Sequence, residues 1–208
     1  MTYFLEPHPI LDHFTQTAKA SPLMARFIQV AKPLKEKGEI SPGATVPVTC
    51  MNRQKEAKIF PMSWGFHFDP VPGKTPGAFV SEADALKAAE KESTRELYRS
   101  HRCIIPASYI VRASLIPLPN GSYQTGDRYV VQPTGEDVCY LAGIYRLEKD
   151  LPVFLLLTQK DSNEYGIPTL PVFIPQAYVR KWISPEEEPD YFVNHSLNSF
   201  VFEKVTMP

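Results

Sequence analysis

The sequence is short of glycine and cysteine, has no excess of either charge, and contains no long hydrophobic run. Its 22 Lys and Arg residues nearly balance 23 Asp and Glu residues, so no global positive field attracts nucleic acid, and any DNA site must be local. Apolar runs such as Val153 to Leu157 are far shorter than the roughly 20 residues that span a bilayer. Residues 1–9 lack a basic start followed by an apolar core. We therefore expect a cytoplasmic protein without a membrane segment.

Motifs for metal, phosphate or hydrolytic chemistry are also missing. With only 10 glycines, the chain has no glycine-rich phosphate loop, and it has neither a His-Glu-x-x-His nor a Gly-x-Ser-x-Gly motif. Cys50, Cys103 and Cys139 are odd in number and too widely spaced for a Cys-x-x-Cys pair. No two histidines lie four residues apart. We expect no metal and no cofactor, and we interpret the cysteines as small buried residues with reduced thiols.

The composition that remains is that of a folded protein rich in proline. Hydrophobic residues at 43% and charged residues at 22% are ordinary for a globular chain. The 21 prolines among 208 residues are roughly twice the average usage of about 5%, which favours short strands and rigid loops over long helices. We predict a single domain over residues 1–208.

Hydrophobic spacing divides the chain into helical ends and a β-rich middle. Helical spacing runs from His8 to Lys37, and short apolar runs bounded by Pro, Gly and Asn follow from Ile40 to Trp64. Residues 69–77 have the composition of an exposed loop. Ser81 and Asp84 resemble a capping box ahead of a helix to about Ser100.

The second half of the chain continues this pattern. A short helix is expected over Gln176–Ile183, followed by an acidic turn over Pro185–Asp190. Strands are expected at Cys103–Val111, Arg128–Gln132, Val138–Tyr145, Val153–Thr158 and Phe200–Val205. Because β segments dominate from Ile40 to Thr158, we predict an α+β fold with a twisted, mainly antiparallel β core and peripheral helices.

An ordered series of short segments gives a more specific indication. They are Ile40-Ser41-Pro42 before Val46-Pro47-Val48, Trp64-Gly65-Phe66, His101-Arg102-Cys103-Ile104-Ile105-Pro106-Ala107, Leu141-Ala142-Gly143-Ile144-Tyr145, Leu170-Pro171-Val172-Phe173 and Trp182-Ile183. In this order and spacing they resemble the SOS-response-associated peptidase (SRAP) family over nearly the whole chain.

The resemblance implies a chemistry whose residues this chain has exchanged. Active family members bind single-stranded DNA and couple to abasic sites through a Cys at position 2, whose amine and thiol close a thiazolidine ring with the sugar aldehyde. Thr2 occupies that position here. Its hydroxyl is a far weaker nucleophile than a thiol.

Three further family positions are changed. The family's Asn-Ala-Arg segment falls on Val80-Ser81-Glu82, although a slip of one residue would place Ser81 at the Asn. Arg112 stands at the catalytic Glu and Ile167 at the catalytic His, and Thr169 replaces a DNA-contacting Arg. The resemblance therefore implies that crosslinking is lost, because the proton-transfer groups are absent.

Three hypotheses follow. The chain is an inactive SRAP homologue that binds single-stranded DNA weakly, with Trp64, Arg102 and Arg112 as candidates for base stacking and phosphate contact. Alternatively, the Thr2 amine forms an imine with an aldehyde. In the third, the scaffold has become a module that binds a protein partner.

Overall fold

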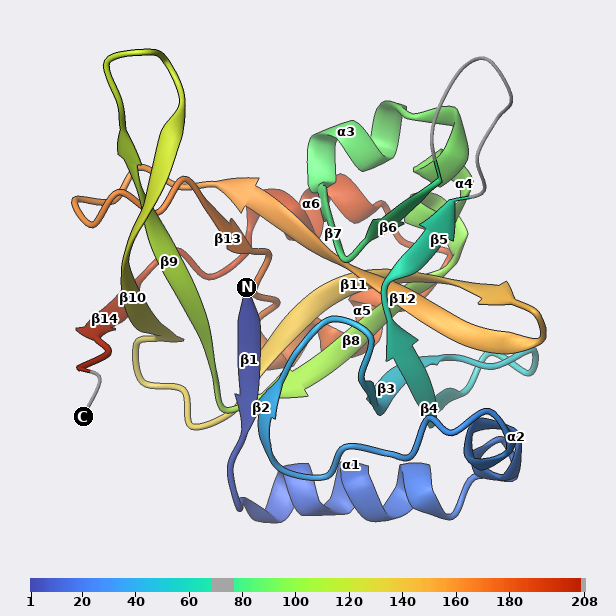
Figure 1. The fold of residues 1–208 in the computed structure, drawn as a ribbon. Coiled ribbons are helices and arrows are strands. Elements are labelled where there is room, and N and C mark those ends of the chain that lie inside the picture. The colour runs from blue at the N-terminus through green and yellow to red at the C-terminus, as the bar shows by residue number, and fades with distance from the viewer. Residues whose placement is uncertain (69–76, 207–208) are drawn as a thin grey trace.

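The computed structural model describes residues 1–68 and 77–206, which form two large sheets and the two-stranded sheet β5-β6, with helices at the periphery (Figure 1). The helices are α1 (Pro9–Lys19), α2 (Met24–Gln29), α3 (Ala85–Glu90), α4 (Glu92–Ser100), α5 (Val179–Trp182) and α6 (Pro189–Asn194), with a 3₁₀ turn, η1 (Gln176–Tyr178). The strands are β1 (Thr2–Leu5), β2 (Gly38–Ile40), β3 (Thr45–Met51), β4 (Ala57–Trp64), β5 (Phe66–Phe68), β6 (Ala78–Val80), β7 (Glu82–Asp84), β8 (Arg102–Ala107), β9 (Tyr109–Pro117), β10 (Tyr123–Pro133), β11 (Cys139–Glu148), β12 (Leu151–Lys160), β13 (Thr169–Pro171) and β14 (Phe200–Lys204).

The larger sheet closes into a barrel. Its strands follow the order β11-β8-β3-β4-β12, and β12 also pairs with β11, which completes the circle. Only the β4–β12 contact within this circle is parallel. Beyond the barrel, β12 continues between β7 on one edge and β13 on the other. The end of β12 therefore brings together two short strands that are far apart in the sequence.

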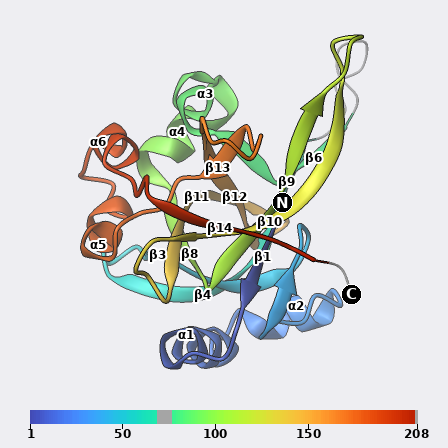
Figure 2. The same cartoon turned by 90° about the vertical axis from the view of Figure 1, so that its left-hand side faces the viewer.

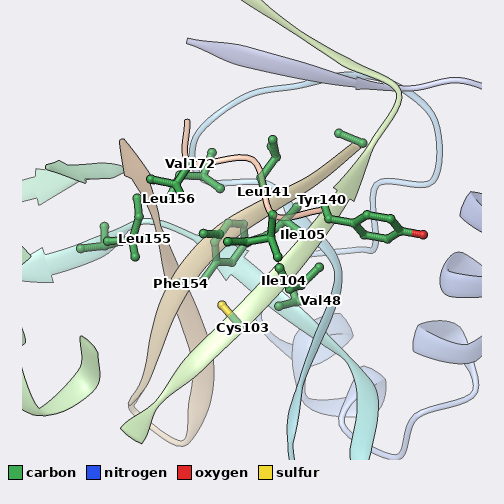
Figure 3. Close-up of a cluster of buried hydrophobic side chains, with 14 of the residues drawn as sticks. Val48, Cys103, Ile104, Ile105, Tyr140, Leu141, Phe154, Leu155, Leu156 and Val172 are labelled. Carbon is green, nitrogen blue, oxygen red and sulfur yellow. The ribbon is translucent and has the colours of Figure 1, made fainter. Parts of the chain in front are cut away.

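The barrel interior is filled by alternate residues of each strand, as the period of two requires. Register places Cys50 opposite Cys103, and Cys103 opposite Gly143. Figure 3 shows part of this buried cluster, including Val48, Ile105 and Phe154. Position 143 must be glycine, because a Cβ there would lie 2.8 Å from both the Ile105 side chain and the Leu155 carbonyl oxygen.

A second sheet packs beside the barrel, in the order β14-β10-β9-β1-β2. Strands β9 and β10 form a long hairpin that projects from the body of the molecule (Figure 2). The N-terminal strand β1 lies between β9 and β2, with Thr2 opposite Val111. This pairing fixes the start of the chain in the middle of a sheet.

The predicted α+β class and mainly antiparallel core are confirmed, and three local predictions are wrong. Asp84 is itself the N-cap of α3, accepting from the Lys87 amide at 3.0 Å, whereas Ser81 lies between strands β6 and β7. The helix to Ser100 is interrupted at Lys91, whose extended backbone separates α3 from α4. The acidic turn ends in helix α6, because Pro189 suits a first helical position. The loop predicted over 69–77 lies, except for Gly77, outside the described residues.

Candidate functional site

Polar groups from three strands meet at the N-terminus of the chain. Met1, which carries the α-amino group, directly precedes β1, while β7 carries Glu82, β9 carries Arg112 and β13 carries Thr169. The Met1 nitrogen lies 3.7 Å from Glu82 Oε1. Strands β7 and β13 both pair with the end of barrel strand β12. This pairing brings Glu82 and Thr169 within reach of the N-terminal group and Arg112.

Arg112 joins two of these strands through its guanidinium group. Nη1 donates to Glu82 Oε2 at 2.6 Å, and Nη2 donates to the Thr169 hydroxyl at 2.5 Å. The side chains of Arg112 and Glu82 are only 15% and 22% exposed. Charge-assisted hydrogen bonds of this kind are stronger than neutral ones. Three positions that the sequence alignment assigned to the family's site thus meet in space.

Thr2 lies near this cluster, since it pairs with Val111, the residue before Arg112. Its hydroxyl donates to Glu39 Oε1 at 2.9 Å, and Arg128 binds the same oxygen at 3.1 Å. The hydroxyl is therefore held by a carboxylate on the neighbouring strand β2.

Ile167 and Val80 add no polar group to the cluster. Ile167 is 1% exposed and belongs to the hydrophobic core. The Asn163 side chain holds its backbone, accepting from the Ile167 amide at 3.1 Å and donating to its carbonyl at 2.7 Å. Val80 pairs with Phe66 and packs against the core. Neither side chain can transfer a proton.

Trp64 does not present its ring to a ligand. It is fully buried, stacks on Phe154 with the ring planes 9° apart, and lies 5.3 Å from the Tyr3 ring centroid. Its indole Nε1 donates to the Ser81 carbonyl at 2.8 Å. We therefore assign Trp64 to the core and not to base stacking.

Arg102 is likewise buried, with 1% exposure. Its guanidinium lies over the Trp182 ring, 5.4 Å from the centroid. It donates to main-chain carbonyls at the ends of α4 and α5 and in the following turn, those of Tyr98, Arg99, Trp182, Ser184 and Glu187. Burial lowers the pKa of Arg102 to about 10, so it stays charged at neutral pH. We assign it a structural role instead of the phosphate contact expected from the sequence.

Glu82 has a role in the site that the sequence did not predict. The resemblance to the family indicated only that a phosphate-binding Arg is lost at this position. Its carboxylate instead contacts both the chain's amino group and Arg112. The available signal was the pair of opposite charge reversals at positions 82 and 112, which together preserve an Arg–Glu pair.

The described residues offer neither a metal site nor a membrane-spanning helix. Within residues 1–68 and 77–206, no group of three His, Cys, Asp or Glu side chains has the arrangement to hold a metal ion. Among the helices described, none has the length and apolar character to cross a membrane.

Comparisons with known proteins agree on the fold. Solved structures similar to this chain include a phage-related protein from Bordetella bronchiseptica, at 14% identity and a TM-score of 0.69, covering 99% of this chain and 94% of that one. A Bacteroides thetaiotaomicron protein matches at 16% identity and a TM-score of 0.67, covering 99% and 91%. No curated protein sequence gives a significant match.

The sequence itself matches one family. The match covers residues 10–207 and is to the family described as SOS response associated peptidase (SRAP). It includes Arg112, Ile167 and Thr169, and it begins after Thr2. This chain belongs to the SRAP family.

Proposed function

We propose that this SRAP-family protein is a DNA-damage-associated protein that binds single-stranded DNA weakly and does not form the thiazolidine crosslink. The observation that carries the proposal is the Arg112–Glu82 pair at the N-terminus. The cation at the catalytic Glu position is bonded within the protein, and position 2 offers a hydroxyl and not a thiol.

Charges on the neighbouring strands support weak binding. Arg112, Arg128 and Lys204 lie on adjacent strands β9, β10 and β14, and each is paired with a carboxylate, of Glu82, Glu39 and Asp127 respectively. Affinity for a nucleic-acid backbone comes largely from cations that replace counterions. Paired cations supply little of this term.

A pocket of about 440 Å³ on the same sheet also disfavours phosphate. Its lining includes Glu6, Asp137 and Glu203. Burial, and then the hydrogen bond to Glu6, raise the pKa of its Tyr109 to about 12. These carboxylates would repel a DNA backbone close to them.

The test is a denaturing gel of the protein mixed with abasic single-stranded DNA. We expect no heat- and detergent-stable adduct. A stable adduct without any reductant would contradict the proposal. Fluorescence anisotropy with an intact oligonucleotide tests binding, and submicromolar affinity at physiological salt would contradict weak binding.

One observation favours a second candidate, reversible imine formation. The α-amino group lies 3.7 Å from Glu82, so a carboxylate is available despite the change at position 112. An amine adds to an aldehyde to give a carbinolamine, which loses water to form an imine, and a carboxylic acid assists that loss by donating a proton. Removal of Met1 would transfer the amino group to Thr2, one residue along β1.

Borohydride separates the two candidates, because it reduces an imine to a stable secondary amine. An adduct that depends on borohydride and weakens in Glu82→Gln supports the imine. Thr2→Cys alone is expected to recover little of the stable crosslink. Adding Arg112→Glu and Ile167→His should recover more, since missing acid–base groups typically cost 10²–10⁴-fold in rate. A triple variant no better than Thr2→Cys would remove support for the roles given to positions 112 and 167.

A further inference from the structure

The barrel has a second accessible feature, away from the N-terminal cluster, at the end where β3 and β11 finish. A pocket of about 400 Å³ opens there between the β3–β4 turn, the β11–β12 turn and the chain around α2. Figure 1 shows where α2 and strands β3, β4, β11 and β12 lie. We name it the barrel mouth. Its lining residues are Leu23, Arg26, Cys50, Met51, Asn52, Arg53, Gln54, Phe60, Met62, Tyr145, Leu147, Asp150 and Pro152.

The floor of the barrel mouth is an extension of the barrel interior. Val46 is opposite Met62 and Val48 is opposite Phe60, so Met62 and Phe60 share the inward face of β4. Tyr145 is opposite Phe154, which places it on the same inward face of β11. Phe60 and Tyr145 are half-buried and Leu147 is exposed, so these three side chains offer an apolar surface, whereas Met62 is 1% exposed. Mouths of this kind, within a range of about 300–1,000 Å³, are preferred positions for small ligands.

The rim carries charge of mainly one sign. Arg26 and Arg53 are exposed, and within the described part of the chain neither forms an ion pair or a side-chain hydrogen bond. Asp150 is the one acidic residue of the lining. The rim therefore has two cations against one anion. An unpaired guanidinium at the edge of an apolar floor fits a carboxylate that carries an apolar tail.

We propose that the barrel mouth binds a small amphipathic monocarboxylate. The tail lies on Phe60, Tyr145 and Leu147, and the carboxylate accepts hydrogen bonds from Arg26 and Arg53. Burial raises the pKa of Cys50 in the floor to about 12, so its thiol stays neutral beside the tail. This site is independent of the function proposed for the N-terminal cluster.

The test uses octanoate as the probe and NMR of the ¹⁵N-labelled full chain. Octanoate should shift amides of residues 51–54 and 145–151 saturably, with a Kd of about 1 mM or tighter. Octanol, which lacks the charge, should bind at least about tenfold more weakly, the worth of one charged hydrogen bond. Acetate, which lacks the tail, should also bind at least about tenfold more weakly, because it buries almost no apolar surface.

Two matched pairs of substitutions locate the anion. Arg26→Gln with Arg53→Gln should weaken octanoate binding about tenfold. Arg95→Gln with Arg180→Gln, which removes the same charge from exposed positions elsewhere, should leave it unchanged. The proposal is overturned if octanoate gives no saturable shifts at the barrel mouth, if octanol binds as tightly as octanoate, or if both variant pairs bind alike.

Discussion

Replacing Glu82 with Gln should turn a weak DNA binder into a stronger one. The substitution removes the carboxylate that accepts from Arg112 at 2.6 Å and leaves the guanidinium available to a phosphate. Each phosphate contact to a single strand adds about 0.7 to the slope of log K against log salt. One new contact should therefore steepen the slope by about 0.7, which is roughly an extra 2.5-fold loss of affinity between about 50 and 200 mM salt.

The same change should cost stability, because Arg112 is only 15% exposed. Exposed pairs contribute about 0.2–1 kcal/mol, and breaking a buried pair costs about 3–5 kcal/mol. We expect about 1–2 kcal/mol for this partly buried pair. Urea unfolding measures that loss and defines the conditions under which the variant is folded for the binding assay.

The assay is fluorescence anisotropy of a labelled single-stranded oligonucleotide at several salt concentrations. Glu186→Gln is the matched control, since it changes the net charge equally but frees Lys55, whose side chain is 71% exposed on the β3–β4 turn. The control should leave the salt slope nearly unchanged. An unchanged slope in Glu82→Gln, or an equal increase in both variants, would refute the reasoning.

Three further predictions concern the fold and its charges. Arg102→Met leaves buried carbonyls without a donor and should cost about 3–5 kcal/mol in urea unfolding, whereas the exposed control Arg95→Met should cost under about 0.5 kcal/mol. Exchanging the pair as Glu82→Arg with Arg112→Glu should restore most of the stability lost in either single reversal, and a double variant less stable than both would contradict a direct pair. Burial raises the pKa of Cys139 to about 12. At pH values above the ordinary pKa of a cysteine, unfolding therefore exposes this thiol and it loses its proton. Stability should fall from about pH 9 to about pH 12, less steeply in Cys139→Ala, and equal slopes would contradict this.

Much of the fold could be predicted because strand patterns are local. Alternation of apolar residues and the bounding Pro, Gly and Asn residues marked the strands from Ile40 to Thr158. Helix ends were less well predicted. Both Ser81 and Asp84 are good capping residues, but Ser81 lies between β6 and β7, where its carbonyl accepts from the Leu156 amide, and Asp84 directly precedes the helix.

The sequence by itself determined the family, the α+β class and the exchange of residues at positions 2, 112, 167 and 169, because these depend on residue identity and order along the chain. Only the tertiary structure decided what the exchanged residues do. Arg112 and Glu82 are 30 residues apart in the sequence. They meet because β7, which carries Glu82, pairs with β12, and β9, which carries Arg112, pairs with the N-terminal strand β1. Likewise, Arg102 and Trp64 carry side chains suited to a nucleic acid, but Trp64 is buried within the closed barrel and Arg102 is buried against the ends of α4 and α5. Burial and pairing are properties of the assembled sheets, and they are set by strand register and barrel closure.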